Sequence, residues 1–279
     1  MTKLKQLDNK LEIIGTLKSK NLEYRTTMDG RQYITGNIII TSKINDVTHD
    51  FMVKVFSMNT QRSFNIFKGI QTVLNEYKSI DQNGEENADY IRVLGSLKYV
   101  HYESVNGEVK EYNEIKGNYF TRLDNKEEGK ALMEIGTVVE GYTIHNESDK
   151  LQIKGFNVAY NNEVVILKNC FVQDEVVDVF KNFYPVNSTG RLICSLSCPT
   201  LEQVPTHAFG ATFSIAKSTQ ETNDLLIEVI GGDIPFEDDR KYTAEKIKLA
   251  KKKLEEKLQE QKHRSNAHMS AIPTTGTGF

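Results

Sequence analysis

Residues 47–58 read VTHDFMVKVFSM, and this stretch decides the fold class. Phe51, Val53 and Val55 occupy every second position, so the residues between them fall on the opposite face. Period-two alternation of β-branched and aromatic residues is typical of a strand with one buried face. The stretch therefore predicts a strand that packs one side against a core and leaves the other side accessible.

Similar stretches lie on both sides of it. Residues 11–17, 33–44, 90–101 and 109–120 are rich in β-branched and aromatic residues, and Asp29-Gly30 and Asn106-Gly107 supply turns between strands. Residues 64–77 carry apolar residues at helical spacing. The order of three strands, a helix and two strands predicts the five-stranded barrel of the OB-fold.

The pattern recurs faintly after a polar stretch at 124–130. Residues 133–138 (MEIGTV) resemble residues 12–17 (EIIGTL), and further strands are expected at 150–159, 163–172 and 189–198, with a helix at 174–183 and two strands within 206–230. We interpret this half as a second, smaller OB-like domain, and an unrelated β-rich domain is the alternative. The predicted fold is thus mainly β, with an OB barrel, a second β-rich domain and a C-terminal helix.

The C-terminal part has a different composition. Residues 242–261 predict a solvated helix with a thin apolar stripe at Ile247, Leu254 and Leu258, and residues 265–279 lack any core-forming pattern and are expected to be disordered. The expected domains are residues 1–125, residues 126–230, and residues 231–279, which comprise an acidic linker, the helix and the tail.

Composition narrows the class of protein. A chain of 279 residues, with 26% charged and 38% hydrophobic residues, is long enough for two domains. No apolar run approaches the ~20 residues of a membrane helix, and the polar start lacks a secretory signal. Three cysteines are a small, odd number, which argues against a disulfide framework. We therefore expect a cytoplasmic protein that does not enter a membrane.

Charge is distributed unevenly along the chain. Residues 1–125 carry 17 Lys and Arg against 16 Asp and Glu, whereas residues 126–230 carry 8 against 14 and residues 231–279 carry 10 against 8. The middle segment would repel a polyanion. The first segment is the part of the chain whose charge suits nucleic acid.

Several motifs follow one another in residues 9–122: Asn9-Lys10 running into Gly15-x-Leu17, then Val53 to Phe56, then residues 91–102. In order and spacing they resemble the opening, third and fourth strands of the bacterial and phage single-stranded DNA-binding protein family. The resemblance implies a non-catalytic, phage-encoded protein that coats single-stranded DNA in replication or recombination. Residues 1–125 would then bind the single strand, and residues 126–230 would serve self-association or partner binding. The order and spacing of the motifs carry the resemblance, because each motif is common by itself.

Stacking aromatics interleaved with cations suit a single strand, since every base has a π-face and every nucleotide a phosphate charge. The predicted nucleic-acid-binding residues are Lys18, Lys20, Tyr24, Arg25, Arg31, Tyr33, Lys54, Phe56, Arg92, Lys98, Tyr99, Tyr102 and Tyr112. The resemblance favours Phe56 and Tyr102 as stacking residues, whereas Phe51 and Tyr90 are expected in the core. The chain has no Trp, although the family usually stacks bases on tryptophan.

The acidic stretch Gly232 to Asp239 contains Asp233, Ile234, Pro235 and Phe236. Family members end in the same four residues, which dock replication and repair proteins. Here the motif is internal, and a coincidence within an acidic linker is the alternative. If it is a docking peptide, it should be exposed and flexible and should bind a helicase, primase or recombinase.

Other chemistry finds little support in the sequence. Residues 210–218 (GATFSIAKS) lack the second glycine of a phosphate loop, and no spacing pairs two carboxylates for acid–base catalysis. Cys170, Cys194, Cys198 and His207 have the wrong spacing for zinc, so buried apolar cysteines are the preferred interpretation. We expect no enzyme, no metal and no cofactor. The competing hypothesis is a structural or scaffold protein whose OB barrels bind protein, and homo-oligomer formation stays open.

Overall fold

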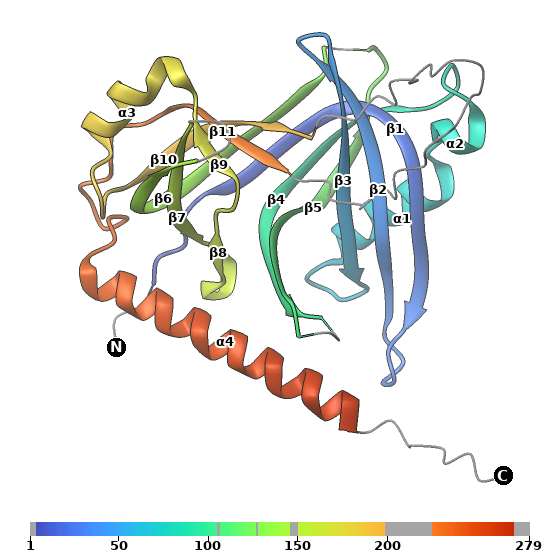
Figure 1. Cartoon of the computed structure of the whole chain (residues 1–279). Helices are drawn as coiled ribbons and strands as arrows, with labels where there is room; N and C mark the ends of the chain where they lie inside the picture. Colours follow the sequence, from blue (N-terminus) through green and yellow to red (C-terminus); the bar gives the residue numbers. More distant parts are fainter. Residues whose placement is uncertain (1–3, 105–106, 127, 146–149, 199–224, 271–279) are drawn as a thin grey trace, which may run out of the picture.

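The structure, a computed structural model, describes residues 4–104, 107–126, 128–145, 150–198 and 225–270. Two β-barrels lie next to each other, and a long C-terminal helix passes along both (Figure 1). All strands of both barrels belong to one continuous 11-stranded sheet.

The first barrel contains five strands. They are β1 (Asn9–Thr26), β2 (Gln32–Ile44), β3 (Val47–Met58), β4 (Tyr90–Glu103) and β5 (Val109–Arg122). They pair in the closed order β1–β2–β3–β5–β4–β1, with β3 and β5 parallel and the other neighbours antiparallel. Helices α1 (Phe64–Glu76) and α2 (Ile80–Asn83) lie between β3 and β4. The predicted OB order is therefore confirmed.

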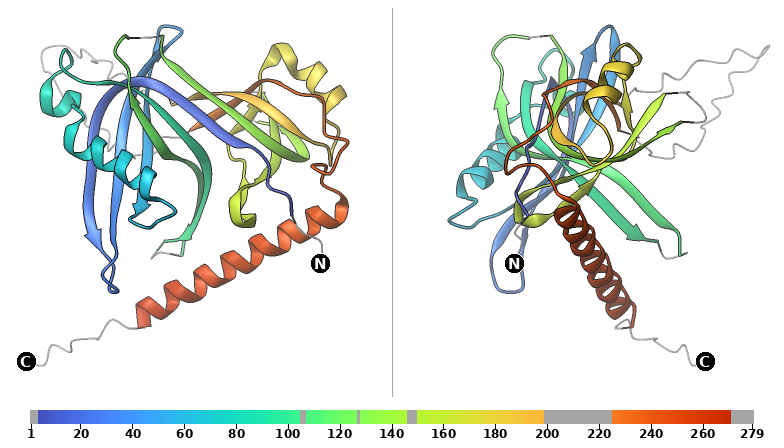
Figure 2. Two further views of the ribbon diagram at one scale, coloured as in Figure 1. Left: turned by 180° about the vertical axis from the view of Figure 1, so that it is seen from behind. Right: turned by 90° about the vertical axis from the view of Figure 1, so that its left-hand side faces the viewer.

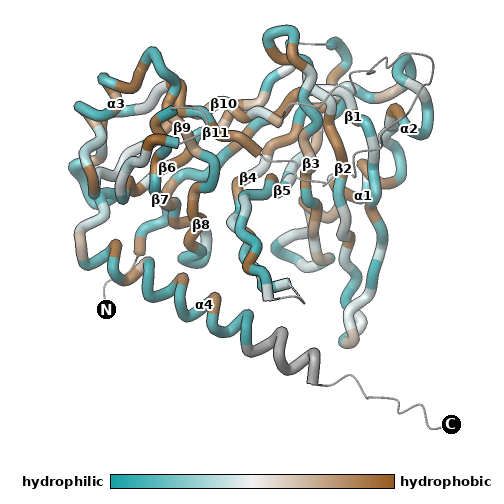
Figure 3. The backbone as a smooth tube through the Cα atoms, viewed as in Figure 1, coloured by the Kyte–Doolittle hydropathy of each residue, from teal (hydrophilic) through white to brown (hydrophobic). Residues whose placement is uncertain are grey.

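The alternation of β3 accounts for the way it is buried. Phe51, Val53 and Val55 are 1%, 0% and 2% exposed and point into the barrel, while Lys54 and Phe56 point outward. Isoleucines of β2 complete the interior, and α1 covers it with its apolar side. Hydrophobic residues follow the strands of both barrels, whereas the C-terminal helix is largely hydrophilic (Figure 3). The placement of Phe51 in the core is confirmed.

The second barrel repeats the pairing of the first. Its strands are β6 (Lys130–Ile144), β7 (Leu151–Val158), β8 (Val164–Ile166), β9 (Cys170–Val172), β10 (Thr189–Ser197) and β11 (Leu226–Gly232). The ring runs β6–β7–β9–β11–β10–β6, and β9 pairs with β11 in parallel, as β3 does with β5. A second OB-like barrel is thus confirmed.

Some elements differ from the sequence predictions. The strand expected at 163–172 is two strands, β8 and β9, because Asn169 adopts a left-handed conformation with φ 49° and turns the chain between them. The helix expected at 174–183 begins as a 3₁₀ turn, η2 (Asp174–Val176), and continues as α3 (Val177–Phe183). Of the two strands expected within 206–230, β11 is observed, and the rest of that range lies outside the described residues.

The two barrels are joined through backbone pairing and through a buried side chain. Residues 9–14 of β1 pair antiparallel with residues 130–135 of β6. The amide of Asn113, on β5, donates to Ile166 O at 2.8 Å and accepts from Lys168 N at 2.7 Å. These bonds fix one barrel against the other. The predicted boundary at 125/126 falls between β5 and β6, but the division into domains stays a prediction.

Helix α4 (Ala244–Ser270) packs more closely than predicted. Ile247 and Ala250 are 8% and 0% exposed and pack in one cluster with Leu4 and Leu7 from the start of the chain. Ile247 belongs to the predicted apolar stripe, and the N-terminal leucines cover this side of the helix, so the first part of α4 is docked rather than fully solvated. The helix also continues to Ser270, so the expected disorder from residue 265 is wrong up to that point, while residues 271–279 lie outside the described residues.

Views from behind and from the end show α4 leaving the second barrel and passing below the first (Figure 2). Lys262 Nζ lies 3.6 Å from Glu103 Oε2 at the end of β4. Across the described ranges, no helix combines the length and the apolar character needed to cross a membrane.

Candidate nucleic-acid interface

The outer face of β2, β3, β5 and β4 brings together four of the six aromatic residues predicted for base stacking. We call this surface the outer face and define it by Tyr33, Lys54, Phe56, Lys98, Tyr102, Tyr112, Glu114 and Lys116. Thr35 of β2 pairs with Phe56 of β3, and Lys54 pairs with Lys116 of β5. Lys98 of β4 pairs with Glu114 of β5. Period-two alternation keeps all of these side chains on the side of the sheet away from the core.

Two aromatic pairs form on the outer face. Tyr33 and Phe56 have ring centroids 5.6 Å apart at an interplanar angle of 45°, and Tyr102 and Tyr112 have centroids 6.5 Å apart at 90°. Phe56, Tyr102 and Tyr112 are 46%, 45% and 40% exposed. Exposed rings of this kind offer π-faces to a ligand without loss of the core.

The lysines of the outer face lie between the two aromatic pairs along the sheet. Lys54 and Lys116 are half-buried and adjacent in register. Burial and the nearby Lys98 ammonium lower the pKa of Lys116. In the described part of the chain, neither Lys54 nor Lys116 has a carboxylate within ion-pairing distance. Their positive charge is thus available to a phosphate group.

Glu114 lies among these lysines. Burial raises the pKa of its carboxyl, and the charges of Lys54, Lys98 and Lys116 oppose that rise. An ionised carboxylate here would repel phosphate. The charge of the outer face therefore depends on the protonation of one residue.

Five of the other predicted cations are engaged with carboxylates. The nitrogen–oxygen distances are 2.6 Å for Lys18–Asp50, 2.5 Å for Arg25–Glu23, 2.5 Å for Arg31–Asp29 and 3.0 Å for Arg92–Glu12, and Lys98 pairs with Glu163. The Arg25–Glu23 and Arg31–Asp29 pairs are exposed, and such pairs contribute little to stability, about 0–1 kcal/mol, so a phosphate can compete for these two cations. The net charge of the five pairs is nevertheless smaller than a count of basic residues implies.

Lys20 and Tyr24 lie away from the outer face. Lys20 Nζ donates to the carbonyl oxygens of Leu74 at 2.8 Å and Tyr77 at 2.6 Å, so it caps the end of α1. Burial lowers the pKa of Lys20. Tyr24 pairs in register with the buried Ile34, and its ring lies 6.4 Å from Phe67 of α1. Both side chains lie on the side of the β1–β2 strand pair that faces α1.

Tyr99 is also committed to a structural contact. Its hydroxyl donates to Glu111 Oε1 at 2.6 Å, and burial raises the pKa of Tyr99. The Lys168 ammonium, followed by the Tyr99 hydroxyl, lowers the pKa of Glu111 to about 2. Because Lys168 belongs to the second barrel, this cluster links the two barrels. Tyr99 thus faces away from the outer face, although it is adjacent to it in sequence.

Sequence reasoning missed Lys116 and Glu114. Both occur in the stretch 109–120, which was predicted to be a strand with Tyr112 as its binding residue. Alternation from Tyr112 places positions 114 and 116 on the same face. The signal was therefore present in the sequence.

The predicted partner motif is only partly exposed. Phe236 is 8% exposed, its amide donates to Thr189 O at 2.7 Å, and the Arg240 guanidinium lies 4.0 Å from its ring centroid. Asp233 Oδ2 accepts from Arg191 Nε at 2.8 Å. The expectation that the whole motif is exposed and flexible is wrong, because Phe236 packs into the cluster that α4 covers. Pro235 is half-buried, and Ile234 is 76% exposed.

No metal site emerges from the cysteines. Cys170, Cys194 and Cys198 are free and buried, and burial raises the pKa of Cys170 to about 12. His207 and residues 210–218 lie outside the described residues. The portion of the chain that is described contains no group of three or more His, Cys, Asp or Glu able to hold a metal.

Several solved structures are similar to this chain. The wild-type single-stranded DNA-binding protein from Thermus aquaticus is 12% identical, covers 86% of this chain and 99% of its own, and gives a TM-score of 0.50. A deletion mutant of that protein is 12% identical, covers 86% of this chain and 98% of its own, and gives a TM-score of 0.47. The mitochondrial single-stranded DNA-binding protein Rim1 from S. cerevisiae is 15% identical and covers 42% of this chain and 98% of its own, with a TM-score of 0.29.

At these identities the first likeness shows a common OB-type fold. No curated protein sequence matches the chain. A family model does match, and it spans residues 8–264, which include both barrels and most of α4. The chain belongs to the YorF family.

Proposed function

We propose that this protein binds single-stranded DNA on the outer face of its first barrel and catalyses no reaction. The observation that carries the proposal is the pair of exposed aromatic clusters, Tyr33–Phe56 and Tyr102–Tyr112, with lysines between them. Strands 2 and 3 of an OB-fold, with the neighbouring loops, form the usual surface for oligonucleotides. The outer face lies on these strands and continues onto β5 and β4.

The expected contacts divide between rings and lysines. Stacking of a base on an aromatic side chain is worth about 1–3 kcal/mol and tolerates any base. Lys54 and Lys116 meet phosphates between the two stacking positions. Binding should therefore be largely independent of sequence and should weaken as salt increases.

A role in replication or recombination, encoding by a phage and a location in the host cytoplasm form the finer part of this proposal. The family resemblance of residues 9–122 supports them, together with the enlarged, two-barrel architecture. Genes for a helicase, primase or recombinase next to the gene for this chain would agree with that role. A gene among unrelated metabolic genes would count against it.

The second barrel offers a surface suited to protein. Val179, Phe183 and Ile234 are 58%, 53% and 76% exposed and border a hollow of about 240 Å³ between α3 and β11. Contiguous exposed apolar side chains favour contact with another protein. This observation supports self-association or docking of a replication partner on the second barrel, and it also favours the competing scaffold hypothesis.

Fluorescence titration with oligo-dT, oligo-U and duplex DNA at several salt concentrations tests the proposal. We expect binding to oligo-dT that is tighter than binding to duplex and that falls linearly in log K against log salt. A scaffold protein would show no salt-dependent binding to any of the three. That result would overturn the proposed function.

A further inference from the structure

An exposed tyrosine stands on the second barrel, close to the first. Tyr160 is 67% exposed and begins the 3₁₀ turn η1 (Tyr160–Asn162) between β7 and β8. Asn161 and Asn162 have φ values of 59° and 60°, a left-handed conformation that Asn adopts more readily than most residues. Ala159 N donates to Glu163 O at 2.8 Å across the turn. The turn is thus closed by its own backbone and leaves the Tyr160 side chain exposed.

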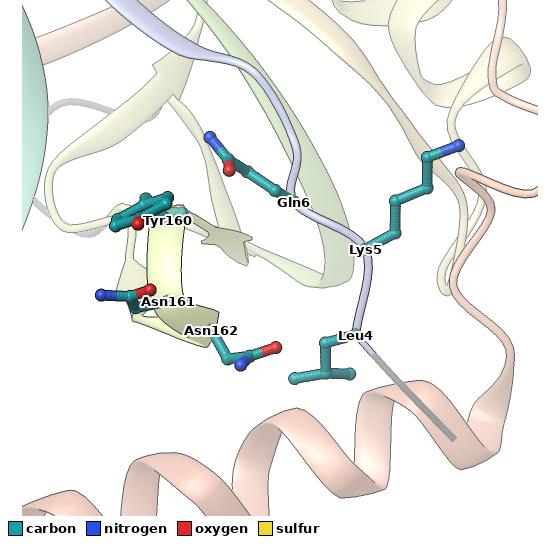
Figure 4. Close-up of a pocket in the computed structure, with 7 residues that line it drawn as sticks. Leu4, Lys5, Gln6, Tyr160, Asn161 and Asn162 are labelled. Atoms are coloured by element: carbon teal, nitrogen blue, oxygen red, sulfur yellow. The ribbon is translucent and has the colours of Figure 1, made fainter. Parts of the chain in front are cut away.

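The first of two hollows beside Tyr160 suits a nucleobase. It has a volume of about 500 Å³ and is lined by Leu4, Gln6, Ala159 and the residues of the turn. Gln6 extends toward Tyr160, and Lys5 points away from the hollow (Figure 4). An aromatic ring with the amides of Gln6, Asn161 and Asn162 combines a stacking surface with groups that match base edges.

The second hollow lies on the other side of the same turn and is lined by charged residues of both signs. It has a volume of about 570 Å³, and Lys98, Lys253 and Lys257 line it together with Glu163, Glu256 and Glu260. Glu163 forms ion pairs with both Lys98 and Lys257, the latter at 3.0 Å. These three side chains together therefore carry one net positive charge.

Lys253 supplies a further cation in this hollow. Glu256 lies 3.7 Å from Lys252, on the same helix. Among the residues that the structure describes, no carboxylate lies within ion-pairing distance of Lys253. A phosphate at this hollow therefore meets Lys253 without first displacing a partner.

The Tyr160 turn adjoins the outer face of the first barrel. Lys98 belongs to both surfaces, because it pairs in register with Glu114 and forms an ion pair with Glu163. The charge of Glu163 also acts on Lys116 and Glu114. A strand that leaves the outer face at Lys98 therefore reaches Tyr160 next.

We propose that Tyr160 is a second stacking site, which takes a nucleotide of the strand bound to the first barrel. The base lies in the amide-lined hollow against the ring, and the phosphate contacts Lys253 of α4. This inference rests on the proposed function and extends it to the second barrel. Helix α4 then forms one wall of the path that the strand follows.

Titrations with oligo-dT of two lengths test the inference on the full chain. An oligomer of about 8 nucleotides fits the site size of one OB-fold, and one of about 30 nucleotides extends past it. We expect the longer oligomer to bind more tightly to wild type. Tyr160→Ala should lose about tenfold of affinity for the longer oligomer and none for the shorter one, and Tyr160→Phe should behave as wild type.

Phe64→Ala is the matched control, because Phe64 is an exposed aromatic on α1 that belongs neither to the outer face nor to the Tyr160 turn. It should leave both affinities unchanged. Equal binding of the longer oligomer by wild type and Tyr160→Ala would overturn this inference and leave the proposed function intact. Absence of binding to either length by wild type would instead overturn the proposed function.

Discussion

Glu114 is the residue that most directly controls the charge of the outer face. Burial raises the pKa of its carboxyl, and nearby phosphates would raise it further, so binding of DNA takes up a proton. Affinity for oligo-dT should therefore fall as pH rises from the ordinary carboxyl value of 4.5 toward neutrality. Glu114→Gln should bind more tightly at neutral pH by roughly 1 kcal/mol, about fivefold. Titration of wild type and Glu114→Gln with oligo-dT across this pH range tests the role of Glu114. Coinciding pH profiles of the two proteins would refute it.

Lys54 and Lys116 should each release about one counterion equivalent when DNA binds. Replacement of either by Ala should weaken binding and make the slope of log K against log salt shallower by about 1. Lys68→Ala is the control, because Lys68 is exposed on α1 and lies outside the outer face. The interpretation fails if the Lys68 variant changes the slope as much as the Lys54 and Lys116 variants do.

At the residue scale, alternation predicted which side chains face outward but not what they contact. Lys54, Phe56 and Tyr102 are exposed or half-buried on the expected side. Lys98 pairs with Glu163, a residue 65 positions away, and that pairing depends on how the barrels meet. Lys20 was a candidate by charge alone, and only the position of α1 reveals its carbonyl partners.

At the scale of elements, the segment after β11 separates two residues that the sequence treated as one motif. Phe236 is buried, so Phe236→Ala should lower the free energy of unfolding by about 3 kcal/mol. Ile234 is exposed, so Ile234→Ala should leave the melting temperature unchanged and weaken self-association or partner capture. Thermal melts and analytical ultracentrifugation of both variants make the comparison. A stable Phe236 variant would contradict the packing described here.

Asn113 holds β5 against the second barrel. Asn113→Ala leaves Ile166 O and Lys168 N without this partner, which should cost about 1–3 kcal/mol of folding free energy. Asn118→Ala, on the outward side of the same strand, should cost little. Denaturant unfolding of the two variants compares them. Equal stability would mean that the barrels are held together by other contacts.

The packing partners of helix α4 could not be predicted from the sequence. Its length and polar surface were recognisable, yet its packing partners are Leu4 and Leu7, more than 230 residues earlier. A weak apolar stripe becomes a docked surface only when such a distant partner is present. The break between β8 and β9 was missed because a left-handed Asn169 leaves no strong signal in a stretch of β-forming residues.

At the scale of the whole molecule, two barrels with the same strand pairing share one sheet and differ in charge. The echo of residues 12–17 in residues 133–138 predicted the second barrel, since both stretches begin the first strand of a ring. The joint between the barrels had no such signal, because β1–β6 pairing depends on which strand edges meet. The account therefore assigns the strand-binding path to the first barrel and to the surfaces that the second barrel and α4 add beside it.

Titration of oligo-dT against wild type, Phe56→Ala and Tyr102→Ala tests the central claim most directly. Phe64→Ala is the control. Phe64 is 48% exposed, close to the 46% of Phe56, but it lies on α1. We expect the Phe56 and Tyr102 variants each to bind about 1–3 kcal/mol more weakly with an unchanged melting temperature, and the Phe64 variant to bind like wild type. Unchanged affinity in both the Phe56 and the Tyr102 variants would contradict binding on the outer face.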